Sequence, residues 1–232
     1  MQLRSVLAST FVLFCMRASP QSVISTHSGL VNFFEGDISI DGRPVPQING
    51  RFPEVPEGSL LTTNDGRVEI LLAPEVFLWL GRHSAIRMQR NSLRDARIDV
   101  LAGAAIIQSA QLPPSDAVTL IYREFQVRLS TQSLYRIDAS LELSVRRGEA
   151  NVTNGVGSFV LTGPRRLIFS SGLTTTLPDG EPDYLDQWAL ERRQTLASAL
   201  ARGEAGANAA KRRPRIHRAY PAVMLPIPRR TS

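Results

Sequence analysis

Short apolar runs with period-two spacing recur between Leu30 and Ser170, and Gly, Pro, Asn and Asp residues interrupt them. Val68, Ile70 and Leu72, for example, fall on one face of an extended chain. Alternation of this kind is typical of half-buried strands, and the interrupting residues are those that favour turns. The pattern predicts an all-β domain over residues 30–176.

Three segments of this domain share one spacing of apolar residues around a glycine. The glycines are Gly36, Gly103 and Gly148, each with apolar residues five and three positions before it and two and four positions after it. Glycine adopts a positive φ without the steric cost that other residues meet. We therefore expect each glycine to bend the chain between two sheet layers, so that both flanking strands face one core.

A second motif precedes the later two glycines. Leu80, Ser84, Ile86 and Met88 recur 49 positions later as Leu129, Ser133, Tyr135 and Ile137. Shared serine and glycine positions favour an internal duplication over a chance match of apolar alternation. The architecture expected is a stacked unit of short strands, either a solenoid or a sandwich that rolls up like one.

The pattern changes after Pro178. Asp183 is placed to cap a helix over residues 183–202, because Leu185, Trp188, Ala189, Leu196 and Leu200 then recur at helical spacing and Gly203 follows. We expect the apolar stripe of this helix to dock on the β domain; a surface for a partner is the alternative. Residues 203–232 are rich in Arg and Pro and lack periodicity, which predicts a disordered tail.

The N-terminal segment has the pattern of an export signal. Arg4 precedes an apolar stretch from Val6 to Met16, which has the length of a secretory h-region and is too short to span a bilayer. We expect a signal peptide over residues 1–22, cleaved near residues 18–24, and a periplasmic or secreted protein; a buried N-terminal strand is the alternative. Cys15 is the one cysteine, so the mature chain would carry none, which suits an oxidising compartment.

Charge is distributed unevenly along the chain. The formal net charge is +6, but residues 202–232 contain eight basic residues and one acid. Residues 23–201 contain 17 basic and 20 acidic residues, so the folded part is mildly acidic and nucleic acid is not expected as a partner. The basic tail could instead associate with anionic polymers or lipid headgroups.

The sequence contains no combination of residues that points to catalysis. His27, His83 and His217 lie in separate regions without metal-ligand spacing, and a nucleophile elbow and a phosphate-binding loop are both missing. Two acidic groups, Asp37 with Asp41 and Asp179 with Glu181 and Asp183, fall in turns, where carboxylates usually cap or face solvent. We expect a non-enzymatic protein with no metal site and no cofactor.

A family resemblance runs through roughly residues 31–170. The run from Glu57 to Met88, EGSLLTTNDGRVEILLAPEVFLWLGRHSAIRM, followed by IDVLAGAAII from Ile98, resembles the FecR domain. The resemblance continues in Tyr135-Arg136-Ile137 and in the segment from Val145 to Ala150. It implies a FecR-like β domain that acts as a periplasmic protein-interaction module.

The best-known members of that family pass a signal from an outer-membrane receptor to a sigma factor. They carry a cytosolic anti-sigma segment and one transmembrane helix before the β domain, and we expect this chain to lack both. The resemblance therefore implies a stand-alone protein-interaction or envelope-sensing module whose partner is an envelope protein. The alternative is a structural or glycan-associated envelope component held to an anionic surface by the basic tail.

Phe77 and Trp79 are the candidate binding residues. Leu78 and Leu80 share one face of their strand, so the two aromatic side chains must point to the other face. Either the C-terminal helix covers them, or they form an exposed aromatic patch for a protein or glycan. Large amphipathic rings are common at such contacts because they supply area at low entropic cost.

Overall fold

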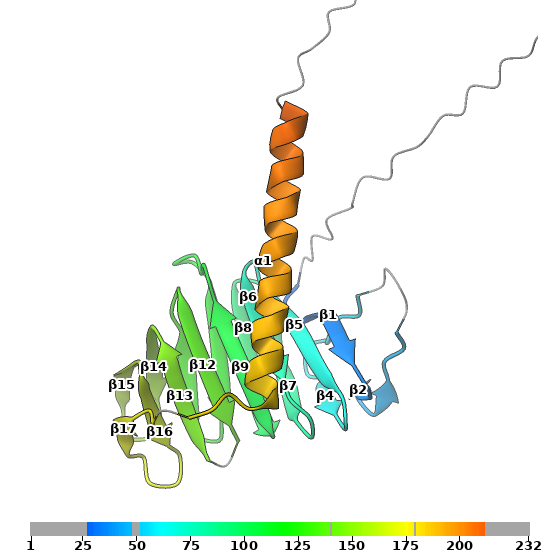
Figure 1. The fold of residues 1–232 in the computed structure, drawn as a ribbon. Coiled ribbons are helices and arrows are strands. Elements are labelled where there is room, and N and C mark those ends of the chain that lie inside the picture. Colours follow the sequence, from blue (N-terminus) through cyan, green and yellow to red (C-terminus); the bar gives the residue numbers. More distant parts are fainter. Residues whose placement is uncertain (1–26, 48–51, 140, 179, 212–232) are drawn as a thin grey trace, which may run out of the picture.

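The computed structural model describes residues 27–47, 52–139, 141–178 and 180–211. In this part of the chain, two sheets pack face to face as a sandwich, and one helix crosses the outer face of one sheet (Figure 1). The eight-stranded sheet has the order β1 (Leu30–Glu35), β5 (Arg67–Ala73), β6 (Val76–Leu80), β9 (Ala104–Ser109), β12 (Ser133–Asp138), β13 (Glu142–Arg147), β16 (Arg165–Ile168) and β17 (Thr174–Thr176).

The second sheet has nine strands among the described residues. Its order is β15 (Ser158–Thr162), β14 (Glu149–Thr153), β11 (Phe125–Leu129), β10 (Ala117–Tyr122), β8 (Asp95–Ala102), β7 (Ala85–Ser92), β4 (Leu60–Thr63), β2 (Ile38–Ile40) and β3 (Arg43–Pro44). Neighbouring strands are antiparallel except β8 and β10, which run parallel. The predicted all-β domain is therefore confirmed as a sandwich, and the solenoid alternative is not the observed arrangement.

The main core fills the space between the sheets. Strands with a clear period of two send alternate side chains inward, as in β5, where Val68, Ile70 and Leu72 are all buried. Leu78 and Leu80 of β6 point into the same core, as their spacing predicts. Since an alternating strand buries one face against the core, the outer face of each strand is available for other contacts.

The three repeat glycines lie where the chain passes from one sheet to the other. Gly36 follows β1 and precedes β2, Gly103 joins β8 to β9, and Gly148 joins β13 to β14. Their φ angles are +68°, +76° and +78°, so the predicted positive φ is found at all three positions. A single positive-φ residue redirects each long strand at the edge between the two layers.

The bends also pack against one another. A Cβ on Gly103 would lie 2.2 Å from Ser84 Oγ, and one on Gly148 would lie 3.0 Å from the Cα of Ser133. Ser84 and Ser133 are the matching serines of the second repeat motif, so each glycine meets the serine of its own copy. The spacing of the motif thus places each glycine close to the backbone of its serine, at the edge where the strands turn.

The two copies of the second motif cross the sandwich in opposite directions. Leu80 ends β6 of the eight-stranded sheet and Ile86 lies in β7 of the nine-stranded sheet, whereas Leu129 and Tyr135 lie in β11 and β12 in the reverse order. All four side chains are buried in the main core. The two copies therefore exchange sheets, which is a sandwich arrangement and differs from the stacked coils of a solenoid.

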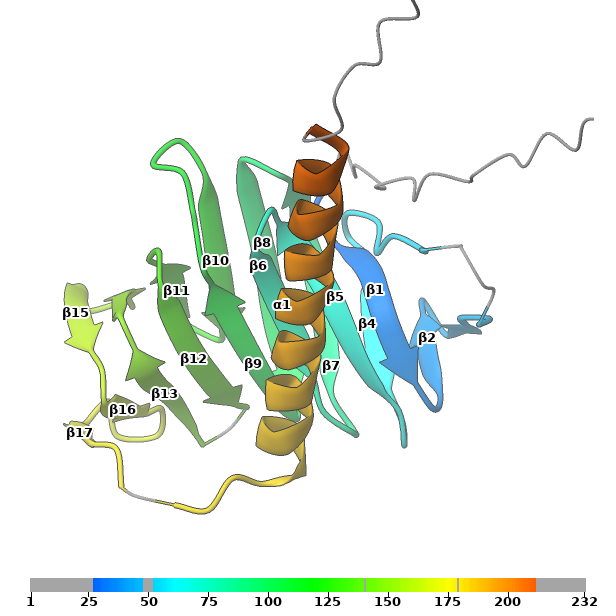
Figure 2. The same cartoon turned by 45° about the horizontal axis from the view of Figure 1, so that its top comes forward.

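Helix α1 (Tyr184–Lys211) follows the sandwich, and its free end projects past the sheets (Figure 2). The predicted cap is confirmed, because the backbone N–H groups of Leu185 and Asp186 donate to Asp183 Oδ1 at 2.9 and 3.0 Å. Within the described residues, no helix is both long enough and apolar enough to cross a bilayer.

The predicted end of this helix near residue 202 is wrong, because residues 203–211 are helical and do not belong to the tail. Gly203 suggested a C-cap, but a glycine inside a helix costs only about 1 kcal/mol relative to alanine. Four of the residues from Ala205 to Ala210 are alanine, which has the highest helix propensity, so a cost of this size does not by itself end the helix at Gly203. The proposed signal peptide over residues 1–22 and the rest of the tail, residues 212–232, lie outside the described residues.

Candidate functional site: the docked helix and the open sheet edge

Trp79 lies beneath helix α1. Its side chain is fully buried in a second apolar cluster, outside the main core, with Ile106 of β9 and with Leu185 and Trp188 of the helix. Phe77 packs against the edge of this cluster, with its ring centroid 6.0 Å from that of Trp79. Of the two arrangements that the sequence allows, the structure has the covered one, so Trp79 is not exposed to a partner. The alternative of an exposed aromatic patch is therefore wrong for Trp79, because helix α1 covers that face of the sheet.

The cluster encloses a buried carboxylate. Glu69 of β5 is fully buried directly across from Trp79 in the strand pairing, and it accepts a hydrogen bond from Trp79 Nε1 at 2.9 Å. Arg192 of the helix donates two hydrogen bonds to it, from Nε at 2.8 Å and Nη2 at 3.0 Å, and Asn32 donates a third. The Arg192 guanidinium also lies 4.0 Å from the centroid of the Phe33 ring. Among these contacts, the one positive charge beside the Glu69 carboxylate is that of Arg192, which belongs to the helix.

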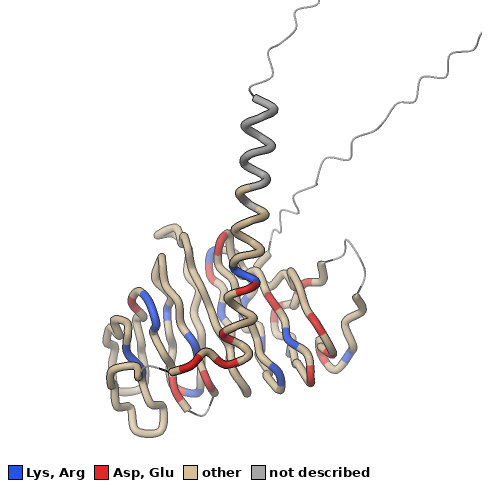
Figure 3. The backbone as a smooth tube through the Cα atoms, viewed as in Figure 1, with Lys and Arg blue, Asp and Glu red and all other residues tan. Residues whose placement is uncertain are grey.

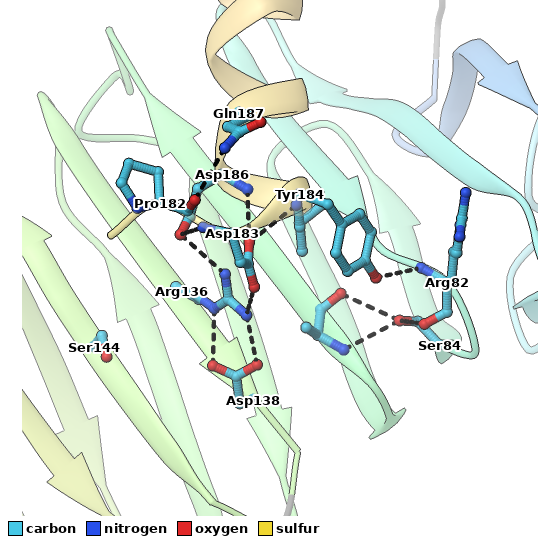
Figure 4. A network of polar contacts seen from close by, with 12 residues as sticks. Arg82, Ser84, Arg136, Asp138, Ser144, Pro182, Asp183, Tyr184, Asp186 and Gln187 are labelled. Atoms are coloured by element: carbon cyan, nitrogen blue, oxygen red, sulfur yellow. Dashed lines mark hydrogen bonds and ion pairs between the residues drawn. The ribbon is translucent and has the colours of Figure 1, made fainter. Parts of the chain in front are cut away.

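A second polar network holds the start of the helix (Figure 4). Arg136 of β12 lies between three carboxylates, at 2.8 Å from Asp138, 2.7 Å from Asp183 and 3.2 Å from Asp186. Asp186 also forms an ion pair with Arg146, whose Nη1 lies 2.7 Å from Asp186 Oδ1. Figure 3 shows acidic residues grouped along the segment that leads into α1. Charge complementarity thus adds to the apolar contacts and fixes the position of the first helical turn.

The pKa values in this network move in the directions that pairing predicts. Burial opposes ionisation of Asp183, but the Arg136 guanidinium and the backbone N–H groups of the helix outweigh it and lower the pKa of Asp183. Burial likewise opposes the charge on Arg136, but Asp138 and Asp183 outweigh it and raise the pKa of Arg136. Both groups are therefore charged at neutral pH in the docked state.

The start of the helix packs closely against Gly81. A Cβ at this position would lie 2.7 Å from the hydroxyl oxygen of Tyr184 and 3.3 Å from Leu185. The same hydroxyl oxygen accepts a hydrogen bond from the backbone N–H of Arg82 at 2.9 Å. The loop after β6 thus receives the start of the helix, with Gly81 at the point of closest approach.

Acid is expected to weaken helix docking through Asp183. Its pKa is lowered in the folded state, so its contribution to stability is present above the ordinary value of 3.8 and is lost as the pH falls through the folded pKa. Asp183→Asn retains a capping side chain but has no charge to lose. We expect this variant to be less stable than the wild type at pH 7 and the difference between them to shrink as the pH falls below the lowered pKa of Asp183.

Tryptophan fluorescence during urea unfolding measures this directly, because Trp79 and Trp188 both lie in the docked cluster. Equal differences between the two proteins at pH 7 and at low pH would contradict the assignment to Asp183. Other carboxylates titrate in both proteins, so the comparison isolates the one position.

The remaining candidate chemistry does not come together. His83 lies 3.6 Å from Asp65 and His27 lies 3.9 Å from Glu54, in exposed pairs at different places, while His217 lies outside the described residues. Asp41 accepts the backbone N–H of Leu60, and this hydrogen bond lowers its pKa. Among the described residues, no group of three or more His, Cys, Asp or Glu side chains is arranged to hold a metal ion.

A surface hollow of about 740 Å³ lies beside the bend at Gly148. Two of its lining residues, Arg147 and Glu149, carry charge, and Ser130 is bonded to the backbone carbonyl oxygen of Glu149 at 2.6 Å. Its lining consists of Ala110, Ser130, Thr131, Gln132, Arg147, Gly148 and Glu149. These groups can form hydrogen bonds, but they do not include a nucleophile paired with a base.

One end of the sandwich is open within the described part of the chain. There, β15 is the last strand of the nine-stranded sheet and pairs with β14 on one side only (Figure 2). Val160 at its centre is 55% exposed, and Val156 in the preceding turn is 97% exposed. Leu173, beside β17 at the edge of the other sheet, is also exposed. Unpaired backbone groups next to exposed apolar side chains are the features by which an extended segment of another chain is bound.

Sequence reasoning singled out the aromatic residues but missed Glu69, Arg136, Arg192 and the edge strand. The sequence did contain a signal for Glu69. This charged residue stands between Val68 and Ile70, whose side chains enter the core, so it faces the other side of the sheet, where its strand partner Trp79 also lies. No local pattern marks β15 as an edge, because that depends on which strands pair.

No family model and no curated protein matches this chain. Two crystal structures of a candidate anti-sigma factor from Parabacteroides distasonis are similar to it, each with 13% sequence identity and a TM-score of 0.42. The aligned region covers 52% of this chain and 59% of the chain in those structures. The similarity therefore extends over little more than half of either protein.

Proposed function

We propose that this chain is a non-enzymatic protein-interaction module of the FecR-like type that acts in the periplasm or outside the cell. The observation that carries the proposal is the open edge at β15, with Val160 exposed at the centre of an unpaired strand. The motifs from Glu57 to Met88 and from Ile98 onward supply the family resemblance. The signal-like segment at residues 1–22 supports export.

The docked helix helps to explain why binding is assigned to the edge. The aromatic and charged side chains on the outer face of the eight-stranded sheet are engaged by α1, including Trp79, Glu69 and Arg136. These groups stabilise the module itself. The exposed apolar side chains at the β15 end have no such role and remain available for an envelope protein that presents an extended segment.

Site-specific photo-crosslinking in the producing cell tests the proposal. A crosslinking residue is placed at Val160 and, as a matched control, at Leu101, an apolar residue that is 44% exposed on the interior strand β8 of the same sheet. We expect protein adducts from position 160 and few from position 101. Adducts at both positions, or at neither, would contradict a binding site at this edge.

A salt series separates this function from its alternative. Strand addition depends on backbone hydrogen bonds and apolar contacts, so adducts at position 160 should survive about 0.5 M salt, where the Debye length falls to a few ångströms. A different result would favour the alternative. If the protein stays on the envelope only at low salt and forms no adducts at position 160, it is attached to anionic polymers or lipid headgroups through residues 202–232.

A further inference from the structure

The edges of the two sheets differ in their protection. β3 is only two residues long and contains Pro44, which has no N–H group to donate. The start of the β1 edge is covered, because the backbone N–H of Val31 donates to the carbonyl oxygen of Pro53 at 2.8 Å and that of Val55 donates to the carbonyl oxygen of Gly29 at 2.9 Å. β17 has three residues, all threonine. Short length, proline and covering segments are the usual devices that prevent strands from pairing between molecules.

Among the residues that the structure describes, β15 has none of these devices. Its sequence, Ser-Phe-Val-Leu-Thr, is five residues long and contains no charge and no proline. It is a full-length partner to β14 along one side, from Ser158 to Thr162. The strand therefore presents an uninterrupted and uncharged edge to solvent.

The sequence of β15 is also complementary to itself. Phe159 and Leu161 face the core, with Leu161 buried and Phe159 partly buried, while Ser158, Val160 and Thr162 face outward. An antiparallel pairing centred on Val160 would place Val160 opposite its own copy. It would also place Phe159 opposite Leu161 on the core side and Ser158 opposite Thr162 on the outer side. Every pair matches apolar with apolar or hydroxyl with hydroxyl, and no like charges meet.

We infer that β15 pairs antiparallel with β15 of a second copy of this chain, so that the nine-stranded sheets of two copies continue across a two-fold axis. This inference rests on the proposed function and names the partner of the same edge. The interface is isologous, since each copy contributes the same strand. A highly charged partner segment is disfavoured, because β15 offers no charge to pair with it.

The dimer should be weak. Five paired residues and the exposed turn at Val156 are fewer than the roughly 20 to 30 residues a side of a standard stable interface. We therefore expect a concentration-dependent equilibrium with a dissociation constant on the order of 10 to 100 µM, between the millimolar and nanomolar ranges of very weak and tight complexes.

Sedimentation equilibrium over a range of concentrations tests the inference with the full chain. The mass of the wild type should rise from that of one chain toward that of two, and Val160→Lys should keep the mass of one chain, because two lysines would face each other. Leu101→Lys adds the same charge on an interior strand and should dimerise like the wild type. Val160→Ser, which adds no charge, should weaken association at least several-fold and guards against a folding defect in the lysine variant.

Hydrogen exchange identifies the strand. Amide protons of residues 158–162 that point away from β14 should gain protection of about tenfold or more as the wild type is concentrated, and this gain should be absent in Val160→Lys. A constant one-chain mass at all concentrations overturns the inference, and so does a dimer that Val160→Lys leaves intact.

The photo-crosslinking experiment separates the two levels of the proposal. Adducts at position 160 with a different protein, together with a monomeric wild type, overturn the second copy as partner and leave the proposed function standing. A monomeric wild type without adducts at position 160 overturns both.

Discussion

Replacing Arg192 with alanine is expected to lower the free energy of unfolding by about 3 to 5 kcal/mol, the cost of removing one partner from a buried ion pair. Arg192 supplies two of the hydrogen bonds to Glu69, whose side chain is fully buried between the sheet and helix α1. Without the guanidinium, the carboxylate keeps Trp79 and Asn32 as donors but has no counter-charge among these contacts. The expected loss exceeds that of an exposed salt bridge, which is worth about 0 to 1 kcal/mol.

Arg193→Ala is the matched control. Arg193 is the next residue of the same helix, and it is bonded to the amide oxygen of Gln108 at 3.3 Å and to a helix carbonyl group, with no carboxylate in these contacts. Chemical denaturation should show a loss of no more than about 1.5 kcal/mol for this variant, the value of a typical hydrogen bond. Combining Arg192→Ala with Glu69→Gln should recover part of the stability, because the buried charge is then gone. Equal losses for Arg192→Ala and Arg193→Ala would show that the buried pair has no special role.

The second large effect is expected at Gly103. Gly103→Ala combines a φ of +76° with a Cβ that would lie 2.6 Å from the Cα of Ser84 and 2.7 Å from the carbonyl oxygen of His83. The left-handed conformation alone costs about 1 to 2 kcal/mol for a residue with a Cβ. The backbone contacts must also move apart at the edge where the two sheets meet. We expect a total loss of about 3 kcal/mol or more in the free energy of unfolding.

Two other glycines separate these contributions. Gly172 has a φ of +68° but open space around its Cβ position, so Gly172→Ala should show the conformational cost alone, about 1 to 2 kcal/mol. Gly157 has neither a positive φ nor a close neighbour, so Gly157→Ala should change stability by less than about 1 kcal/mol. If denaturant melts rank the three variants in another order, the glycine repeat does not reflect bends at the sheet edge.

The bends illustrate how far local pattern leads. The spacing around Gly36, Gly103 and Gly148 is a property of neighbouring residues, and it predicted both the positive φ and the passage between layers. The helix cap at Asp183 was predictable for the same reason, since its partners lie two and three residues away. The helix end was not, because a glycine inside a helix costs only about 1 kcal/mol and Gly203 therefore does not decide by itself where the helix ends.

The helix-docking contacts depend on a different kind of information. Glu69 and Arg192 are 123 positions apart, and the sequence contains other carboxylates and arginines with which each could pair. Trp79 could be covered or exposed with the same strand pattern. Packing of α1 on β6 and β9 decided between these alternatives.

By itself, then, the sequence determined the strands, the glycine bends, the face of each strand that enters the core and the start of the helix, because these follow from side-chain size, φ preference and hydrogen bonds over a few residues. Only the tertiary structure decided that the strands form a sandwich, that α1 covers Trp79, that Arg192 neutralises Glu69 and that β15 is an open edge. These features depend on which distant segments pair, and pairing is set by the fit of whole sheets, which no short stretch of sequence contains.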